Sequence, residues 1–367
     1  MPLSSARRTR RPVLLRLALV VAGLAAAFLL AEVAFRVVES IRLRRAGELW
    51  AVHDDTLGWL PNPRYGDHNA LGLRDRPVAE KNGRTRILFL GDSVLYYGDD
   101  IDDTLVGHLR AELNDHRLGD TDARGFPRGP DPAPDRQPGA EPFDVIDAGV
   151  KGYTNWQELQ FLKLRGLDLR PDLVGVAFVL NDCYRMLHQF RVEDGKIVGQ
   201  SYEFSDEAVR DESFAKRILR SSRLLVWLRH RFASIDAVPA GEFSFDHRPD
   251  FRAAWRDEPW SAIESQLREL VDLGRAHGFA VFLVAFPFGD QYRPDYLARD
   301  RAYVLKPQQR LVEICARLGI PCLDLYPLLD PAADLDEDRI HLSAPGRVHA
   351  AARIAAFLRT EKLLPAR

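Results

Sequence analysis

The segment Arg-Ile-Leu-Phe-Leu-Gly-Asp-Ser at residues 86–93 decides how this chain is organised. It begins as a short apolar run of strand-forming residues and ends in Gly91-Asp92-Ser93, so it predicts a buried parallel strand that delivers Ser93 into a turn. A helix is predicted from about 104 to 114. Ligands of open α/β sheets bind just outside the carboxyl ends of the strands. A hydroxyl placed there is a nucleophile if a base reaches it, although Gly-Asp-Ser is also ordinary turn chemistry.

Strands and helices alternate along much of the remaining chain. Strands are predicted at 143–148, 173–180, 279–286 and 321–325, and helices at about 155–167, 260–277, 303–318 and 344–358. This alternation predicts right-handed crossovers and an α/β fold in which helices cover both faces of a parallel sheet.

Composition restricts the class of protein. The 367 residues are 46% hydrophobic and 28% charged, which suits one large globular domain with appendages or two small domains. A net charge of −2 favours no nucleic-acid partner. Three cysteines do not make a disulfide scaffold; Cys315 and Cys322 are either buried free thiols or a pair under oxidation. The sequence has no zinc-site spacing, GxGxxG or P-loop, so we expect no metal and no cofactor.

The amino-terminal region predicts a membrane anchor. Residues 1–12 are basic, and the apolar run within 13–38 reaches the ~20 residues that a membrane-spanning helix needs. A signal-anchor helix is the main interpretation; a cleaved signal peptide and a buried soluble helix are the alternatives. We expect the amino terminus in the cytoplasm and the large domain outside the cytoplasmic (inner) membrane.

The rest of the chain divides by composition. Residues 39–84 are polar and rich in turn residues, and predict an extended membrane-proximal collar. A catalytic domain is predicted at 85–362. It contains a proline-rich surface loop at 119–142 and an insertion at 185–250. Helical spacing at 212–232 predicts a helical cap over the site or a surface that meets membrane or acidic glycan; an amphipathic helix packed on the domain is the alternative.

Five residues in four loops form the candidate site. Ser93, Gly152 and Asn181 each follow a predicted parallel strand, and therefore share one edge of the sheet. Asp338 and His341 lie in a fourth loop. Two intervening residues let the carboxylate reach the imidazole Nδ1–H, which leaves Nε2 free to take the serine proton. The N–H groups of Ser93 and Gly152 and the Asn181 amide are candidate oxyanion donors.

The four blocks resemble the SGNH (GDSL-type) hydrolase family. The blocks are Gly91-Asp92-Ser93, Gly149 to Gly152, Asn181-Asp182 and Asp338 to Ser343, and they occur in the family's order over roughly 86–360. The resemblance implies a flavodoxin-like three-layer α/β/α sandwich with a five-stranded parallel sheet, acting on O-acyl esters without a metal. The Gly58-Trp59-Leu60-Pro61 and 69–75 elements resemble the membrane-anchored bacterial branch that is often associated with cell-surface polysaccharides.

The resemblance also implies roles for the site residues. Ser93 would be the nucleophile, His341 the base and Asp338 its orienting acid, with Ser93, Gly152 and Asn181 as the oxyanion hole. Gly149 is the alternative glycine donor. The chain departs from the family at two places. Val179 stands where the asparagine block often has glycine, and Val94-Leu95 replaces a frequent Phe-Thr pair.

Three functions remain open at this stage. The first is a membrane-held serine esterase that removes acetyl or another short acyl group from an acylated glycan or a small ester. The second is an O-acyltransferase that uses the same site for polysaccharide acylation. The third is a catalytically inactive scaffold or binding component, which has no need of Ser93, Asp338 and His341 together.

Overall fold

A computed structural model describes residues 10–45, 50–114, 141–183, 186–193, 196–204, 222, 224–225, 228, 238, 241–248 and 251–365. The described residues divide into two units. Most of the expected basic tail, the proline-rich loop up to residue 140 and most of the expected helix at 212–232 lie outside the described residues.

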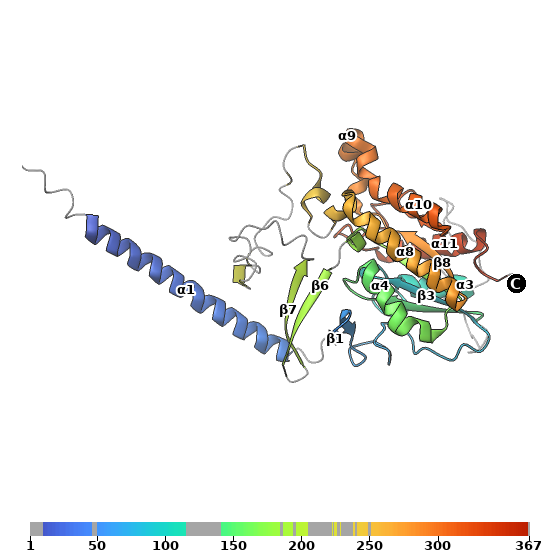
Figure 1. The fold of residues 1–367 in the computed structure, drawn as a ribbon, viewed down its shortest axis with the longest axis horizontal. Helices are drawn as coiled ribbons and strands as arrows, with labels where there is room; N and C mark the ends of the chain where they lie inside the picture. The colour runs from blue at the N-terminus through green and yellow to red at the C-terminus, as the bar shows by residue number, and fades with distance from the viewer. Residues whose placement is uncertain are drawn as a thin grey trace, which may run out of the picture. The chain divides into compact units, whose positions relative to one another are not determined.

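The smaller unit is built on one long apolar helix, α1 (Arg10–Arg45) (Figure 1). Its segment Ala18–Val38 is long and apolar enough to cross a membrane. Glu32 is the buried acidic exception in this segment, because its carboxylate accepts hydrogen bonds from Ser222 Oγ (2.8 Å) and Leu224 N (3.0 Å). Arg36 Nε lies 2.6 Å from the same carboxylate. The helix therefore has polar partners within its own unit.

The larger unit contains the expected five-stranded parallel sheet. Its strands are β3 (Thr85–Gly91), β4 (Phe143–Gly149), β5 (Leu173–Phe178), β8 (Ala280–Ala285) and β9 (Cys322–Asp324), in the order β4-β3-β5-β8-β9. The first of these five strands along the chain, β3, lies inside the sheet, so the strand order reverses beside it. The carboxyl ends of β3, β4 and β5 adjoin one another, where a doubly wound sheet binds its ligands.

Helices cover both faces of this sheet (Figure 1). They are α2 (Ser93–Tyr96), α3 (Leu105–Asn114), α4 (Asn155–Phe161), α8 (Glu258–His277), α9 (Pro294–Val304), α10 (Lys306–Leu318) and α11 (Ala344–Thr360). Two predicted helices differ in detail. The one at 155–167 becomes a π turn after Phe161. The one at 303–318 is the end of α9 followed by α10, because Pro307 fits only the first turn of a new helix.

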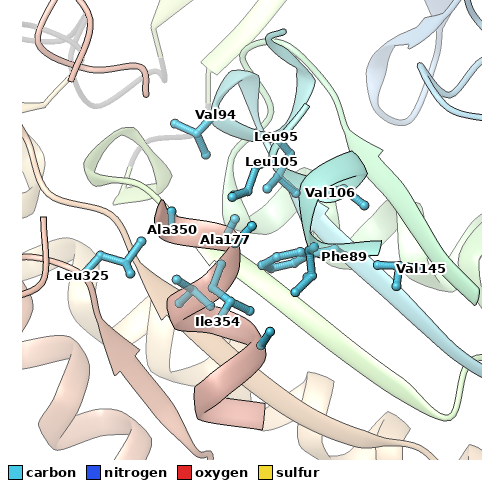
Figure 2. Packing of buried hydrophobic residues seen from close by; sticks show 14 of the residues in the cluster. Phe89, Val94, Leu95, Leu105, Val106, Val145, Ala177, Leu325, Ala350 and Ile354 are labelled. Carbon is cyan, nitrogen blue, oxygen red and sulfur yellow. The ribbon is translucent and has the colours of Figure 1, made fainter. Parts of the chain in front are cut away.

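The main core lies between the sheet and helices α3 and α11 (Figure 2). Phe89 and Val145 from the sheet pack with Leu105 of α3 and Ile354 of α11, and all four are at most 1% exposed. Strand residues alternate between faces, so Leu88 points the other way. A Cβ on Gly166 would approach Leu88 Cδ2 to 2.9 Å, which places the turn after α4 on that opposite face.

Residues 50–84 do not form an extended collar, because they fold onto the larger unit. β1 (Ala51–Asp54) and β2 (Gly58–Pro61) pair antiparallel. Leu57, Trp59 and Leu73 are fully buried. Tyr153 donates to the Trp59 carbonyl (2.7 Å), which joins β2 to the loop after β4. The polar, turn-rich composition of this segment gave no indication that these three apolar side chains would be buried.

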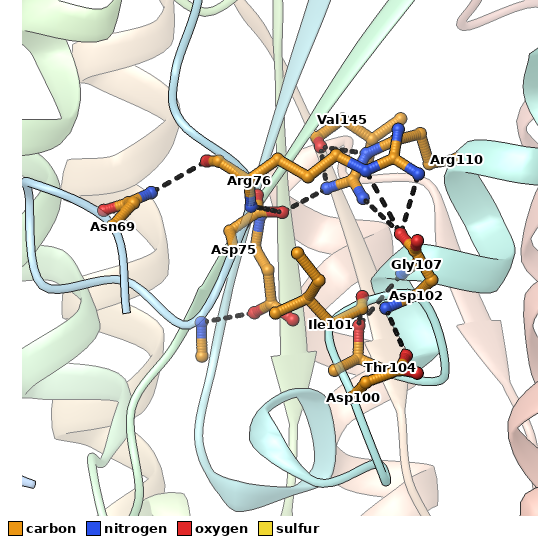
Figure 3. Close-up of polar contacts among 12 residues, drawn as sticks. Asn69, Asp75, Arg76, Asp100, Ile101, Asp102, Thr104, Gly107, Arg110 and Val145 are labelled. Carbon is orange, nitrogen blue, oxygen red and sulfur yellow. Dashed lines mark hydrogen bonds and ion pairs between the residues drawn. The ribbon is translucent and has the colours of Figure 1, made fainter. Parts of the chain in front are cut away.

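A buried ion pair fastens the same segment to α3 (Figure 3). Arg110 Nη2 donates to Asp75 Oδ1 (2.5 Å) and to the Val145 carbonyl (2.8 Å). The other oxygen of Asp75 accepts the backbone N–H of Asp147 (2.8 Å). Both charged side chains are at most 7% exposed. The segment before β3 is therefore part of the domain that carries Ser93.

The insertion at 185–250 is not helical throughout. β6 (Met186–Glu193) and β7 (Lys196–Phe204) pair as a two-stranded sheet. Asp194-Gly195 stands between them in the sequence, and this dipeptide is a strong signal for a tight hairpin. The prediction of a helical insertion did not take this dipeptide into account.

Candidate active site

The turn after β3 presents Ser93 at the start of α2. Asp92 is the N-cap of this short helix, and its Oδ1 accepts the Val94 N–H at 2.9 Å. Gly91 permits the tight approach of α2 to the sheet, because a Cβ there would lie 2.7 Å from Leu95 Cδ1 and 2.9 Å from Ala177 Cβ. The Gly-Asp-Ser sequence thus supplies a close packing point, a helix cap and an accessible hydroxyl.

The loop before α11 brings His341 to that hydroxyl. His341 Nε2 lies 2.8 Å from Ser93 Oγ. On the other side of the ring, Nδ1 lies 2.5 Å from Asp338 Oδ2. The carboxylate acceptor assigns the proton to Nδ1, so the lone pair of Nε2 faces the serine. Residues 93, 338 and 341, far apart in the sequence, are therefore joined in one hydrogen-bonded chain.

The same loop is fixed by its own backbone bonds. Asp338 Oδ1 accepts the N–H groups of Ile340 (2.9 Å) and His341 (3.0 Å), so one side chain holds both the backbone and the imidazole. Arg339 has a φ of +63°, and its carbonyl accepts the Gly289 N–H at 2.8 Å. These contacts limit the positions that the imidazole can take relative to Ser93.

Hydrogen bonding keeps the Asp338 carboxyl ionised. Burial by itself raises the pKa of Asp338, but hydrogen bonds from the His341 ring and from the N–H groups of His341 and Ile340 outweigh it and bring the pKa well below its ordinary value. An ionised Asp338 is what an imidazole needs in order to be oriented and to be stabilised once it becomes charged.

The two glycine candidates differ in whether their N–H is available. The Gly149 N–H already donates to Asp147 Oδ1 at 2.8 Å. The Gly152 N–H and the Ser93 N–H have no acceptor in the part of the chain that the structure describes. Gly152 has a φ of +75°, a conformation that L residues rarely adopt. The geometry thus favours Gly152 over Gly149 as a donor to a substrate.

Asn181 lies behind the serine and is held by Asp92. It sits in the 3-10 turn Leu180–Cys183 after β5, and its Nδ2 donates to Asp92 Oδ2 at 2.8 Å. That oxygen lies 3.5 Å from Ser93 Oγ. Burial raises the pKa of Asp92, although the hydrogen bonds from Val94 and Asn181 oppose this. The Asp92 carboxyl thus caps α2 and holds the Asn181 side chain, which is a structural role.

The comparisons with known proteins identify the family. A model of the GDSL-like lipase/acylhydrolase family matches residues 89–347. The chain belongs to this family. Its catalytic domain is accordingly that of a serine ester hydrolase. A search of curated proteins found no match.

Solved structures with a similar chain trace have low sequence identity. LAE5, an α/β hydrolase from the metagenome of Lake Arreo, Spain, is 16% identical over 77% of this chain and 97% of its own, with a TM-score of 0.41. A lipase/acylhydrolase from Enterococcus faecalis is 16% identical over 77% of this chain and 98% of its own, with a TM-score of 0.40. A catalytic mutant of Axe2, an acetylxylan esterase from Geobacillus stearothermophilus, is 15% identical over 78% of this chain and 100% of its own, with a TM-score of 0.40.

Two further buried acids lie behind the site of this GDSL-family domain. Asp182 accepts the Val179 N–H at 2.7 Å and so braces the turn that carries Asn181. Neither oxygen of Glu158 has a hydrogen-bond partner among the described residues. Burial, and then the negative charges of Asp182 and Asp92, raise the pKa of Glu158 well above its ordinary value. No sequence pattern distinguished Glu158 from an ordinary helix residue of α4.

Sequence reasoning also missed a cation and three aromatic rings beside the GDSL-family triad candidates. Lys151 precedes Gly152, and its ammonium lies over the rings of Tyr96, Tyr97 and Trp50. The available signal was the pair of tyrosines three and four residues after Ser93. Among the residues that the structure describes, no cluster of His, Cys, Asp and Glu has a geometry that could hold a metal ion.

Proposed function

We propose that the protein is a membrane-anchored serine esterase in which Ser93 is the nucleophile, His341 the general base and Asp338 the group that orients it. The observation that carries the proposal is the 2.8 Å separation of His341 Nε2 and Ser93 Oγ, with Nδ1 bound to Asp338. This is the nucleophile–base–orienter arrangement that activates a serine.

The reaction follows from these contacts. As Ser93 Oγ attacks the ester carbonyl, its proton passes to His341 Nε2, and the imidazolium then protonates the departing alcohol. Water enters, gives a proton to Nε2 and attacks the acyl-serine. As the Oγ–acyl bond breaks and the carboxylic acid leaves, the imidazolium returns that proton to Ser93 Oγ. Each tetrahedral intermediate bears a negative oxygen, to which the Ser93 N–H, the Gly152 N–H and the second Asn181 amide hydrogen donate.

Retention of α1 in the mature protein is part of the proposal. Supporting it, Glu32 inside the apolar segment is bound by Ser222 Oγ and Leu224 N, whereas a cleaved signal peptide would lose these contacts. We place the amino terminus in the cytoplasm and the hydrolase domain on the opposite side of the membrane. The expected outcome is a full-length chain that stays in the membrane fraction at alkaline pH; a mature amino terminus after residue 38 would contradict it.

We propose a short acyl group, acetyl, on a cell-surface glycan as the substrate. The support is the likeness of segment 58–75 to the membrane-anchored branch of the family. Measured rates on acetyl, butyryl and octanoyl esters should fall with chain length. Acyl transfer to a glycan acceptor that outpaces hydrolysis would instead identify a transferase.

Fluorophosphonate labelling tests the nucleophile directly. The probe should label wild-type protein at one serine, and Ser93→Ala should abolish both labelling and ester hydrolysis. Ser261→Ala is the matched control, because Ser261 lies in the first turn of α8, where its Oγ donates to the Glu258 carbonyl. Equal labelling of wild type and Ser93→Ala would refute the assignment.

A further inference from the structure

Lys151 places a positive charge beside the candidate catalytic residues. Its Nζ lies 4.3 Å from the centre of the Tyr96 ring, 5.1 Å from that of Tyr97 and 5.6 Å from that of Trp50. All three distances are within the range of cation–π attraction. The rings thus hold the ammonium in a defined position directly before Gly152.

This ammonium has no anionic partner among the described residues. In the part of the chain that the structure describes, Lys151 Nζ donates to no oxygen and pairs with no carboxylate. Asp67 is the acid whose negative charge acts on the pKa of Lys151, and its carboxylate already pairs with Arg74 Nε at 3.0 Å. Burial, and then the positive charge of Arg74, lower the pKa of Lys151. A half-buried cation with aromatic contacts alone is incompletely compensated, and an incoming anion would complete it.

The cation is also close to the reacting atoms. The Tyr97 ring contacts both groups: the Lys151 ammonium lies over it, and the His341 imidazole packs edge to face against it with the ring centres 4.5 Å apart. Tyr97 is 41% exposed, so this place is open to solvent. One aromatic ring thus links Lys151 to the imidazole that contacts Ser93, which puts the ammonium within reach of a substituent on an ester held at Ser93.

We propose that Lys151, within the rings of Trp50, Tyr96 and Tyr97, is an anion subsite that binds a carboxylate or similar negative group of the ester substrate. The inference rests on the proposed esterase function and names the charge class of its substrate. A neutral sugar stacking on these rings is the less suitable occupant, because the ammonium lies over the ring faces that stacking would use.

The charge can belong to either half of an ester, and a binding experiment separates the two. Full-length Ser93→Ala protein in detergent is titrated calorimetrically with para-acetoxybenzoate, charged on the alcohol side, with monophenyl succinate, charged on the acyl side, and with neutral phenyl acetate. At least one charged ester should bind roughly tenfold more tightly than phenyl acetate, as expected for a charge-assisted hydrogen bond. Raising the salt concentration should reduce this preference.

Substitutions assign the preference to Lys151. In the Ser93→Ala background, Lys151→Met should abolish it and Lys151→Arg should retain most of it. Lys163→Met is the matched control, because Lys163 already pairs with Glu269 in another part of the domain, and it should keep the preference. Equal binding of charged and neutral esters, or a preference that survives Lys151→Met, would overturn the inference.

Turnover is measured separately from binding, so that a failure of the esterase proposal can be distinguished from a failure of the anion-subsite proposal. Hydrolysis of phenyl acetate by wild-type protein, absent in Ser93→Ala, tests the esterase. Binding of the charged esters tests the anion subsite whether or not turnover is seen.

Discussion

The Asn181 side-chain amide donates a 2.8 Å hydrogen bond to Asp92, the residue directly before the proposed nucleophile. One amide hydrogen is therefore fixed, which also fixes the direction of the second. Asp92 is 2% exposed and caps α2 through Val94, so the asparagine and the serine turn are held by the same carboxyl group. This link ties the proposed oxyanion donor to the strand β3 that delivers Ser93.

Replacing Asn181 by alanine should lower kcat by roughly 10²–10³-fold with little change in KM, because an oxyanion donor acts mainly in the transition state. Steady-state kinetics on a short acyl ester measure both constants. The melting temperature serves as the control for folding. A kcat within threefold of wild type, in a protein of normal stability, would remove Asn181 from the oxyanion hole.

At acid pH, the activity should depend on the loss of a single proton. The Asp338 carboxyl, with its pKa held well below the ordinary value, stays ionised as the pH falls. The imidazole is therefore the group of the pair whose protonation stops the reaction. A plot of log kcat/KM against pH should keep a slope of one down to about pH 3, below the ~3.9 at which an ordinary Asp takes up its proton. A slope of two at acid pH would show that Asp338 titrates as well.

The sheet and the candidate triad were accessible from sequence because their signals are local. Residues 86–93 combine a strand-forming run with a turn. Asp338 and His341 stand three apart in one loop, and the carboxylate reaches the ring as that spacing predicted. The five parallel strands followed from regular alternation with helices. These features need no knowledge of distant contacts.

Other parts depended on tertiary contacts that composition hides. The segment 50–84 is polar overall, yet Trp59 and Leu73 are fully buried, and Asp75 finds Arg110 only once α3 is in place. Glu158 gave no sequence signal, because its burial beside Asp182 is decided by the packing of α4 against β3 and the turn after β5. The contact of Lys151 with Tyr97 likewise joins two loops that only the parallel register of β3 and β4 brings together.

The buried acid Glu158 predicts a stability that falls with rising pH. Folding raises the pKa of Glu158, so above about pH 4 the folded state holds a proton that the unfolded chain releases. The stability that this proton contributes at low pH is therefore lost as the pH rises through the folded-state pKa. Glu158→Gln keeps the shape without the charge. It should raise the free energy of unfolding at pH 8 by about 1–3 kcal/mol and by less at pH 5. Urea unfolding at both pH values measures this, and equal destabilisation at both would contradict it.

The buried ion pair between Arg110 and Asp75 predicts a large effect of breaking it. Arg110→Met leaves the Asp75 carboxyl buried without its cation, close to Asp147, whose pKa burial and the Asp75 charge already raise well above the ordinary value. The free energy of unfolding should fall by about 3–5 kcal/mol. Arg275→Met breaks the exposed pair with Asp272 and should cost less than about 1 kcal/mol. Urea midpoints of the two variants measured in parallel decide the matter: similar shifts would mean that segment 50–84 is not held to α3 by this pair.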